Sequence, residues 1–202
     1  MSKPISVTVL PNGPLKISCE QAIAVSFKGE ALASEPGQDH YLCRCGKSKN
    51  APYCDGTHAK VGFDGSPSER KPRDAKVWQG RTIQTRFDRG LCMHIYTCEP
   101  LDGLRKAELE GDDSAAQKIA DKVQQCPSGA LQFSADSAES PEPEGPALII
   151  REGAEIQLQG AYEINHPMRP GQPTTRATLC RCGLSQNKPY CDGRHSQARD
   201  FA

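Results

Sequence analysis

A cysteine-rich motif that occurs twice, in the same internal register, is the feature that most constrains how this chain folds. Both copies read Cys-Arg-Cys-Gly, then Pro-Tyr-Cys-Asp-Gly after a short interval, then a histidine. The first copy runs from Cys43 to His58 and the second from Cys180 to His195, so every shared residue is offset by 137 positions. An ungapped match over so many chemically distinctive residues indicates a duplication. We call the two parts of the chain that carry these copies repeat 1 and repeat 2.

The cysteines are more typical of metal ligands than of disulfides. There are 10 among 202 residues, and the stretch from Met1 to Ile5 lacks the apolar run of a signal peptide. We therefore expect a cytoplasmic protein, because a reducing compartment keeps thiols free. The longest aliphatic run, residues 147–150, is far shorter than the roughly 20 residues that span a bilayer, so no membrane span is expected. Equal numbers of basic and acidic residues, 25 of each, argue against a nucleic-acid partner.

Each copy of the motif offers three thiols and one imidazole. The candidate metal ligands are Cys43, Cys45, Cys54, His58, Cys180, Cys182, Cys191 and His195. Such a set suits either a tetrahedral zinc ion or a [2Fe–2S] cluster. Structural zinc sites usually pair their cysteines with two to four residues between them, and the first pair here is tighter, Cys-x-Cys. The spacing therefore favours the cluster, with two ligands on each iron, and leaves zinc as the alternative.

The complete motif of repeat 1, Cys-x-Cys-x2-Ser-x3-Pro-x-Cys-Asp-Gly-Thr-His, resembles the CDGSH iron–sulfur domain of the mitoNEET family. Repeat 2 matches it except at Arg194, a cation where the family prefers a small residue. The resemblance covers roughly residues 1–66 and 145–202. It implies one [2Fe–2S] cluster per motif, held by three cysteines and one histidine, in a β-rich fold where two motifs meet about a twofold axis. A chain with two copies is then expected to form this pseudo-dimer by itself, as a monomer.

The residues beside the ligands have expected supporting roles. Asp55 and Asp192 are expected to act as N-caps that orient the following histidine. Ser48 and Ser185 are candidates for hydrogen bonds to sulfur, with a simple turn role as the alternative.

Short alternating apolar segments precede each motif and indicate β-strands. They are expected at 5–9, 15–17 and 25–27 in repeat 1, and at 148–151, 156–158 and 162–164 in repeat 2. Polar stretches that contain proline, 64–72 and 134–146, are typical of linkers. The sequence therefore predicts an α+β, β-rich fold with CDGSH-type domains at 1–66 and 145–202 and a small α/β insert, similar to ferredoxins, at 77–133.

The insert has its own pattern of secondary structure. A strand is expected at 82–87, followed by a helix over 114–125. In that helix the residues Ala116, Ile119, Ala120 and Val123 fall on one apolar stripe. Asp112 or Asp113 is expected to cap its N-terminus.

Cys92, Cys98 and Cys126 are candidates for a third metal site. The turn Cys126-Pro127 is similar to the last-ligand turn of bacterial ferredoxins, and the segment resembles divergent single-cluster [4Fe–4S] domains. A fourth cysteine is missing, so His94, Cys19 or an exogenous group would have to complete the set. The alternatives are a [3Fe–4S] cluster, or no metal, with the thiols packed as small hydrophobic groups. Cys19 itself is expected to be structural.

The ligand sets favour an iron–sulfur protein that carries single electrons or delivers clusters, with redox or cluster-acceptor proteins as its partners. The expected cofactors are two [2Fe–2S] clusters, with a third iron–sulfur cluster in the insert as a further candidate. The sequence contains no G-x-G-x-x-G, G-x-x-x-x-G-K or G-x-S-x-G motif, so an intrinsic enzyme is not expected. A structural zinc module and an oxidoreductase remain the alternatives.

Overall fold

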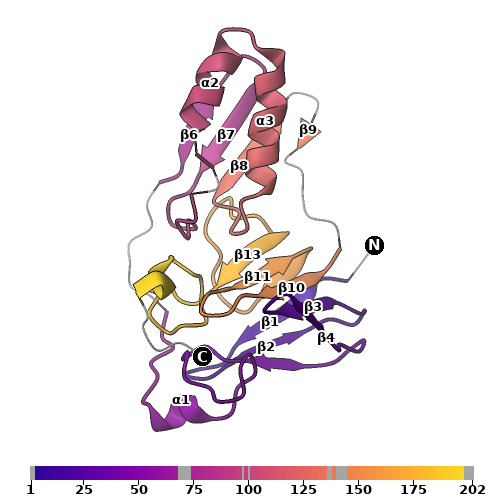
Figure 1. Ribbon diagram of the computed structural model, residues 1–202, viewed down its shortest axis with the longest axis vertical. Helices are drawn as coiled ribbons and strands as arrows, with labels where there is room; N and C mark the ends of the chain where they lie inside the picture. The colour runs from indigo at the N-terminus through magenta and orange to yellow at the C-terminus, as the bar shows by residue number, and fades with distance from the viewer. Residues whose placement is uncertain are drawn as a thin grey trace.

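The computed structural model describes residues 3–67, 74–96, 98–99, 101–135, 138–139 and 145–197 (Figure 1). The two repeats together contain β1 (Ile5–Val9), β2 (Leu15–Ser18), β3 (Ala24–Phe27), β4 (Glu30–Leu32), β5 (His40–Leu42), α1 (Thr57–Lys60), β10 (Ala147–Ile150), β11 (Ile156–Gln159), β12 (Tyr162–Ile164), β13 (Arg176–Leu179) and the 3-10 helix η1 (Arg194–Gln197). The middle segment contains β6 (Lys76–Gln79), β7 (Ile83–Phe87), α2 (Leu101–Leu109), α3 (Asp113–Gln124), β8 (Leu131–Ala135) and β9 (Ala138–Glu139). The architecture is α+β and rich in strands, as the sequence predicts.

Each repeat completes its sheet with a strand taken from the other repeat. In the sheet of order β12-β1-β2-β5, β12 of repeat 2 pairs in parallel with β1 of repeat 1. In the sheet of order β13-β11-β10-β3-β4, β3 of repeat 1 pairs in parallel with β10 of repeat 2. The remaining neighbours in these two sheets are antiparallel. The exchange is reciprocal, which relates the two repeats by the pseudo-twofold expected of an intrachain pseudo-dimer.

Alternation along the strands places one face of each sheet in a shared core. In β1 the side chains of Ile5 and Val7 are buried while Ser6 is exposed, and β2 buries Leu15 and Ile17 in the same way. The same hydrophobic cluster includes Leu148, Ile150, Ile156, Leu158, Ala177 and Leu179 from repeat 2. Because burial of apolar surface is the main stabilising contribution to folding, the two repeats stabilise one another.

In the middle segment α2 and α3 lie against one face of the sheet of order β6-β7-β8-β9 (Figure 1). The buried stripe of α3, formed by Ile119, Ala120 and Val123, packs on apolar side chains of β7 and β8. Asp112 caps α3, since its carboxylate accepts a hydrogen bond from the amide of Ser114 at 2.9 Å. The helix predicted over 114–125 is confirmed, one residue earlier at each end.

Polar contacts hold the middle segment on repeat 2. Arg169 donates two hydrogen bonds to the carboxylate of Asp88, at 3.1 and 2.9 Å. Arg176, on β13, is 1% exposed and donates to the carbonyl oxygens of Val123 and Cys126 at 2.9 and 3.4 Å. Figure 1 shows β11 and β13 of repeat 2 between the middle segment and strands β1 and β2 of repeat 1.

Some elements differ from the sequence prediction. The helix α2 was not expected, because Gly103 within it weakens the helical pattern. The predicted linker 134–146 begins too early, since β8 extends to Ala135 and β9 lies within it. Residues 136–137 and 140–144 of that linker, and 68–72 of the linker 64–72, lie outside the described residues.

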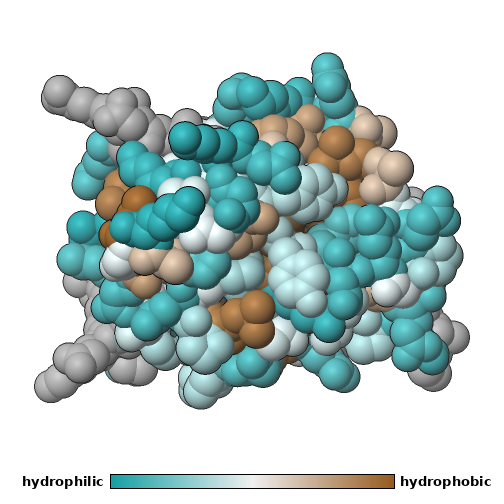
Figure 2. All heavy atoms as spheres, turned by 90° about the horizontal axis from the view of Figure 1, so that it is seen from below, coloured by the Kyte–Doolittle hydropathy of each residue, from teal (hydrophilic) through white to brown (hydrophobic). Residues whose placement is uncertain are grey.

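The surface carries few large apolar features at the end opposite the middle segment. Figure 2 shows this end covered mostly by hydrophilic residues, with apolar side chains in separate small groups. In the part of the chain that the structure describes, no helix is long and apolar enough to cross a membrane.

Replacing Asp88 by Asn tests how the middle segment is held. The Asp88 side chain is 2% exposed, so the change leaves the Arg169 guanidinium without its counter-charge in a buried place. Removing one partner of a buried ion pair is expected to lower the free energy of unfolding by about 3 kcal/mol, measured by urea denaturation. Lys106→Gln is the control, because its ion pair with Glu110 is exposed and is expected to change stability little. Equal losses in the two variants would contradict this prediction.

Candidate metal centre

The two ligand loops are closed by the same short ladder of backbone hydrogen bonds. In repeat 1, β5 leads directly into Cys43, whose amide donates to the Pro52 carbonyl at 2.9 Å, and the amide of Cys54 donates to the Tyr41 carbonyl at 2.8 Å. In repeat 2, β13 leads into Cys180, whose amide donates to the Pro189 carbonyl at 2.7 Å. The amide of Cys191 donates to the Thr178 carbonyl at 2.9 Å. Each loop therefore returns on its own strand, which brings the third cysteine back beside the first two.

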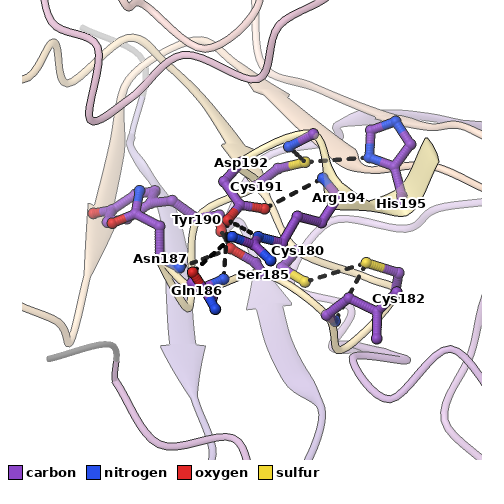
Figure 3. A network of polar contacts seen from close by, with 12 residues as sticks. Cys180, Cys182, Ser185, Gln186, Asn187, Tyr190, Cys191, Asp192, Arg194 and His195 are labelled. Carbon is purple, nitrogen blue, oxygen red and sulfur yellow. Dashed lines mark hydrogen bonds and ion pairs between the residues drawn. The ribbon is translucent and has the colours of Figure 1, made fainter. Parts of the chain in front are cut away.

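The structure places the eight predicted ligands in four close pairs, two in each loop. In repeat 1 the sulfur atoms of Cys43 and Cys45 are 3.7 Å apart, and Cys54 Sγ lies 3.2 Å from His58 Nδ1. In repeat 2 the corresponding distances are 3.8 Å between Cys180 and Cys182 and 3.4 Å between Cys191 and His195 (Figure 3). In the described chain, no three His, Cys, Asp or Glu side chains are placed to hold one metal ion.

A serine at the turn of each loop holds the loop closed from inside. Ser48 Oγ donates to the carbonyl of Tyr53 at 2.6 Å and accepts from the amide of Asn50 at 3.1 Å. Ser185 makes the same two bonds, to Tyr190 at 2.6 Å and from Asn187 at 2.9 Å. Both serines are buried. Their hydroxyl groups thus bond to the loop backbone rather than to sulfur.

The aspartates fix the far end of each loop, although they are not N-caps. Helix α1 has Gly56 at its N-cap, with φ 83°, and Asp55 precedes it. The Asp55 carboxylate accepts from the amides of Lys49 at 2.8 Å and Thr57 at 3.0 Å. These amide hydrogen bonds hold the pKa of Asp55 well below its usual range.

Asp192 occupies the same position in repeat 2. Its carboxylate accepts from the amides of Gln186 at 3.0 Å and Arg194 at 3.3 Å (Figure 3). The guanidinium of Arg194, the residue that departs from the motif, also bonds to this carboxylate, at 3.1 Å. The extra cation is therefore neutralised within its own loop.

The thiols lie in surroundings that suit metal coordination. Burial raises the pKa of Cys45 to about 11 and also raises the pKa of Cys191. The hydrogen bond between Cys180 and Cys182 lowers the pKa of Cys180 to about 6 and raises the pKa of Cys182. Buried thiolates need a nearby positive charge, which a coordinated metal ion supplies. The amides of Gly56 and Gly193 also donate to the sulfur atoms of the third cysteines, at 3.5 and 3.4 Å.

Two buried arginines between the ligand cysteines join the sites to the rest of the fold. Arg44 is 2% exposed and donates to the carbonyl of Leu10 at 2.7 Å. Arg181 is 1% exposed and donates to the carbonyl of Arg151 at 3.3 Å. These arginines were not among the residues predicted from the sequence, although their place between two candidate ligands in both copies was the available signal.

These arginines also connect the two sites electrostatically. Burial lowers the pKa of Arg44, and the neighbouring Cys180 of repeat 2 opposes this shift. Burial likewise lowers the pKa of Arg181, opposed first by Cys43 of repeat 1. Each guanidinium therefore lies close enough to interact with the first cysteine of the other repeat.

The middle segment contacts the ligand loop of repeat 2. A Cβ added at Gly193 would collide with the carbonyl group of Met93, and Asn187 Nδ2 donates to the Gly90 carbonyl at 2.6 Å. At the equivalent Gly56, an added Cβ would meet no described atom within 4 Å. The two sites thus have the same candidate ligands and different neighbours.

The burial and the charge around the histidine pairs differ as well. Cys191 is 2% exposed, whereas Cys54 is only half-buried. Nε2 of His195 lies 3.9 Å from a carboxylate oxygen of Glu155, whose side chain is 2% exposed. Glu155 could not be recognised from the sequence, since a single acidic residue at the start of a strand is usually a solvated charge.

Two of the three remaining candidate ligands, Cys98 and Cys126, pack against the hydrophobic core of the middle segment. Burial raises the pKa of Cys92 and Cys98, and Cys126 raises the pKa of both further by its charge. Cys92 Sγ lies 3.8 Å from Nδ1 of His94, which has the unusual φ of 58°. Cys19 packs in the core shared by the two repeats, so it is structural as expected and is not the missing fourth ligand.

Comparison with known protein families agrees with this division of the chain. A family model described as an iron-binding zinc finger of CDGSH type matches residues 12–59 and 144–196. A second model, described as a divergent 4Fe-4S mono-cluster, matches residues 78–136. No curated protein and no solved structure matches the chain.

Ser48→Ala tests the internal hydrogen bonds of the ligand loop. The change leaves the buried Tyr53 carbonyl and the Asn50 amide without their partner, which is expected to lower the free energy of unfolding by about 2 kcal/mol in urea denaturation. Ser6→Ala is the matched control, because Ser6 is exposed on β1. If the two variants are equally stable, the serine is only a turn residue.

Proposed function

Because the chain belongs to the CDGSH-type iron-binding family, we propose that each repeat holds one [2Fe–2S] cluster through three cysteines and one histidine. The observation that carries this proposal is the arrangement of the ligands in two separate pairs per loop. A tetrahedral zinc ion needs four donors converging on one point, whereas a [2Fe–2S] cluster needs two donors on each of two irons. The donor set, with backbone amide groups directed at three of the sulfur atoms, fits the cluster.

The function that follows is the transfer of single electrons, or of whole clusters, to redox or cluster-acceptor proteins. A bound [2Fe–2S] cluster supplies a one-electron redox couple, and a neutral imidazole in place of one thiolate raises its potential relative to a four-cysteine site. This chain's own residues hold the ligands apart in pairs, bury the sulfur atoms and bring the two loops together. A carrier rather than an enzyme is the function that needs only these features.

We propose further that Cys92, Cys98 and Cys126 hold a third iron–sulfur cluster. The match to the divergent 4Fe-4S model and the mutual influence of the three thiols support this proposal. His94 is the candidate for the fourth ligand, because its ring lies next to Cys92. Packing of the same thiols as small hydrophobic groups is the alternative.

Metal content and colour test the proposal directly. The purified protein is expected to absorb visible light and to contain about four irons per chain, two for each [2Fe–2S] cluster. A clear excess over four irons, lost in Cys126→Ser, would support the third cluster. A colourless protein with stoichiometric zinc would rule out the iron–sulfur function.

Two assays on the iron-loaded protein separate the two kinds of transfer. Incubation with an apo-ferredoxin measures cluster delivery, seen as the acceptor's own visible spectrum after separation. Reduction by a ferredoxin reductase measures electron uptake. A cluster carrier loses iron to the acceptor, whereas an electron carrier is reduced rapidly and keeps its iron.

Acid is expected to bleach the clusters through His58 and His195. An imidazole coordinates only while its ligating nitrogen is deprotonated, so protonation at low pH competes with the metal. Asp55 stays ionised in that range, because its pKa is held well below the usual value. The double variant His58→Cys, His195→Cys is expected to bleach more slowly on a drop in pH, followed by visible absorption. Unchanged bleaching would show that acid acts elsewhere.

A further inference from the structure

Glu155 distinguishes the ligand site of repeat 2 from that of repeat 1. Its side chain is 2% exposed, and Gln157 Nε2 donates to its Oε1 atom at 2.7 Å. Arg151 Nε lies 3.6 Å from the same oxygen, from the exposed side. The other oxygen, Oε2, faces Nε2 of His195 at 3.9 Å, while Nδ1 of that ring faces Cys191. A fixed carboxylate therefore lies behind the histidine ligand, on the side away from the proposed cluster.

The first repeat has no carboxylate at the equivalent position. The correspondence follows from the backbone: Arg44 donates to the Leu10 carbonyl, just as Arg181 donates to the Arg151 carbonyl. The amide of Leu10 bonds to the carbonyl of Pro14 at 3.2 Å, and the amide of Arg151 bonds to the carbonyl of Glu155 at 3.1 Å. Pro14 thus stands where repeat 2 has Glu155, and proline offers no polar side chain.

A carboxylate in this position has a defined electrostatic effect on a metal site. It makes the imidazole a stronger electron donor, and its negative charge disfavours the addition of an electron to the metal. The effect is larger in a buried place than in water, because the local dielectric constant is lower. The repeat 2 site has surroundings of this low-dielectric kind. Glu155 and Cys191 are buried, and the carbonyl group of Met93 lies against Gly193.

The two ligand loops touch, which allows an electron to pass between them. A Cβ added at Gly183 of repeat 2 would lie 3.3 Å from the carbonyl oxygen of Cys45 in repeat 1. In the repeat 1 loop, a Cβ added at Gly56 would meet no described atom within 4 Å, so the loop is open at this position. The repeat 2 loop instead contacts the segment that carries Cys92.

We propose that the repeat 2 site has the lower reduction potential of the two, that Glu155 is the positioning residue responsible, and that single electrons pass from repeat 2 to repeat 1. In this step one electron leaves the reduced repeat 2 site, which is oxidised by one equivalent, and reduces the repeat 1 site by one equivalent. No bond forms or breaks and no proton moves. The inference rests on the proposed function, since it requires a [2Fe–2S] cluster in both repeats.

Glu155→Gln tests this inference in the full, iron-loaded chain. Potentiometric titration with dithionite, followed by visible absorption and EPR, is expected to show two steps for the repeat sites of the unmodified protein. In the variant, the equilibrium constant for reduction of the lower-potential site is expected to increase about tenfold, which raises its reduction potential by about 59 mV. The potential of the other site is expected to stay the same. His195→Cys assigns the lower step to repeat 2 if it changes the EPR signal of that step, and His58→Cys should change the other.

Glu163→Gln is the matched control, because it removes the same charge from repeat 2 at an exposed side chain on β12. It is expected to leave both steps unchanged, and Glu155→Asp, which keeps the charge, should retain most of the separation. Equal shifts in Glu155→Gln and Glu163→Gln, or a lower step that responds to His58→Cys, would overturn the inference while the proposed function stands. Absence of two [2Fe–2S] signals in the unmodified protein would overturn both.

Discussion

The exchange of one strand between the repeats is the constraint on which the rest of the structure depends. β12 pairs with β1 and β3 pairs with β10, so each sheet needs both repeats to be complete. Since β5 and β13 are the strands that lead into the ligand loops, the same exchange brings the two loops together. The buried arginines extend this dependence, because each lies near a cysteine of the other repeat. The strand pairing between the repeats therefore also determines how the two candidate metal sites lie relative to each other.

Metal binding and folding are expected to support each other in such a chain. The body has small sheets and a modest hydrophobic core, and two of its long loops carry the candidate cysteine ligands. Serine and aspartate side chains bond to the loop backbone and leave the sulfur atoms to the metal. Buried thiolates are energetically unfavourable without a positive charge beside them. Metal coordination supplies that charge and cross-links the loop, which stabilises the fold.

The close pairs of candidate ligands could be anticipated from the sequence, because each set lies within one short loop, where local spacing decides which side chains can meet. Their binding of metal stays a prediction. It could not predict the strand exchange, because alternation shows which residues of β1 are buried but not which strand lies beside it. Glu155 was missed for a related reason. Its role arises from His195, which is 40 positions away in the chain and is brought near by the fold. The repeat therefore predicted two similar sites, and the difference between them follows from tertiary contacts.

The most direct test of the central claim is X-ray absorption at the iron and zinc K-edges on the full, purified chain. Two donors on each of two irons predict an iron signal with sulfur and nitrogen in the first shell and a distinct iron–iron scattering path. A zinc signal with four nitrogen and sulfur donors and no metal–metal scattering path would contradict the arrangement of the ligands in pairs around a two-iron cluster.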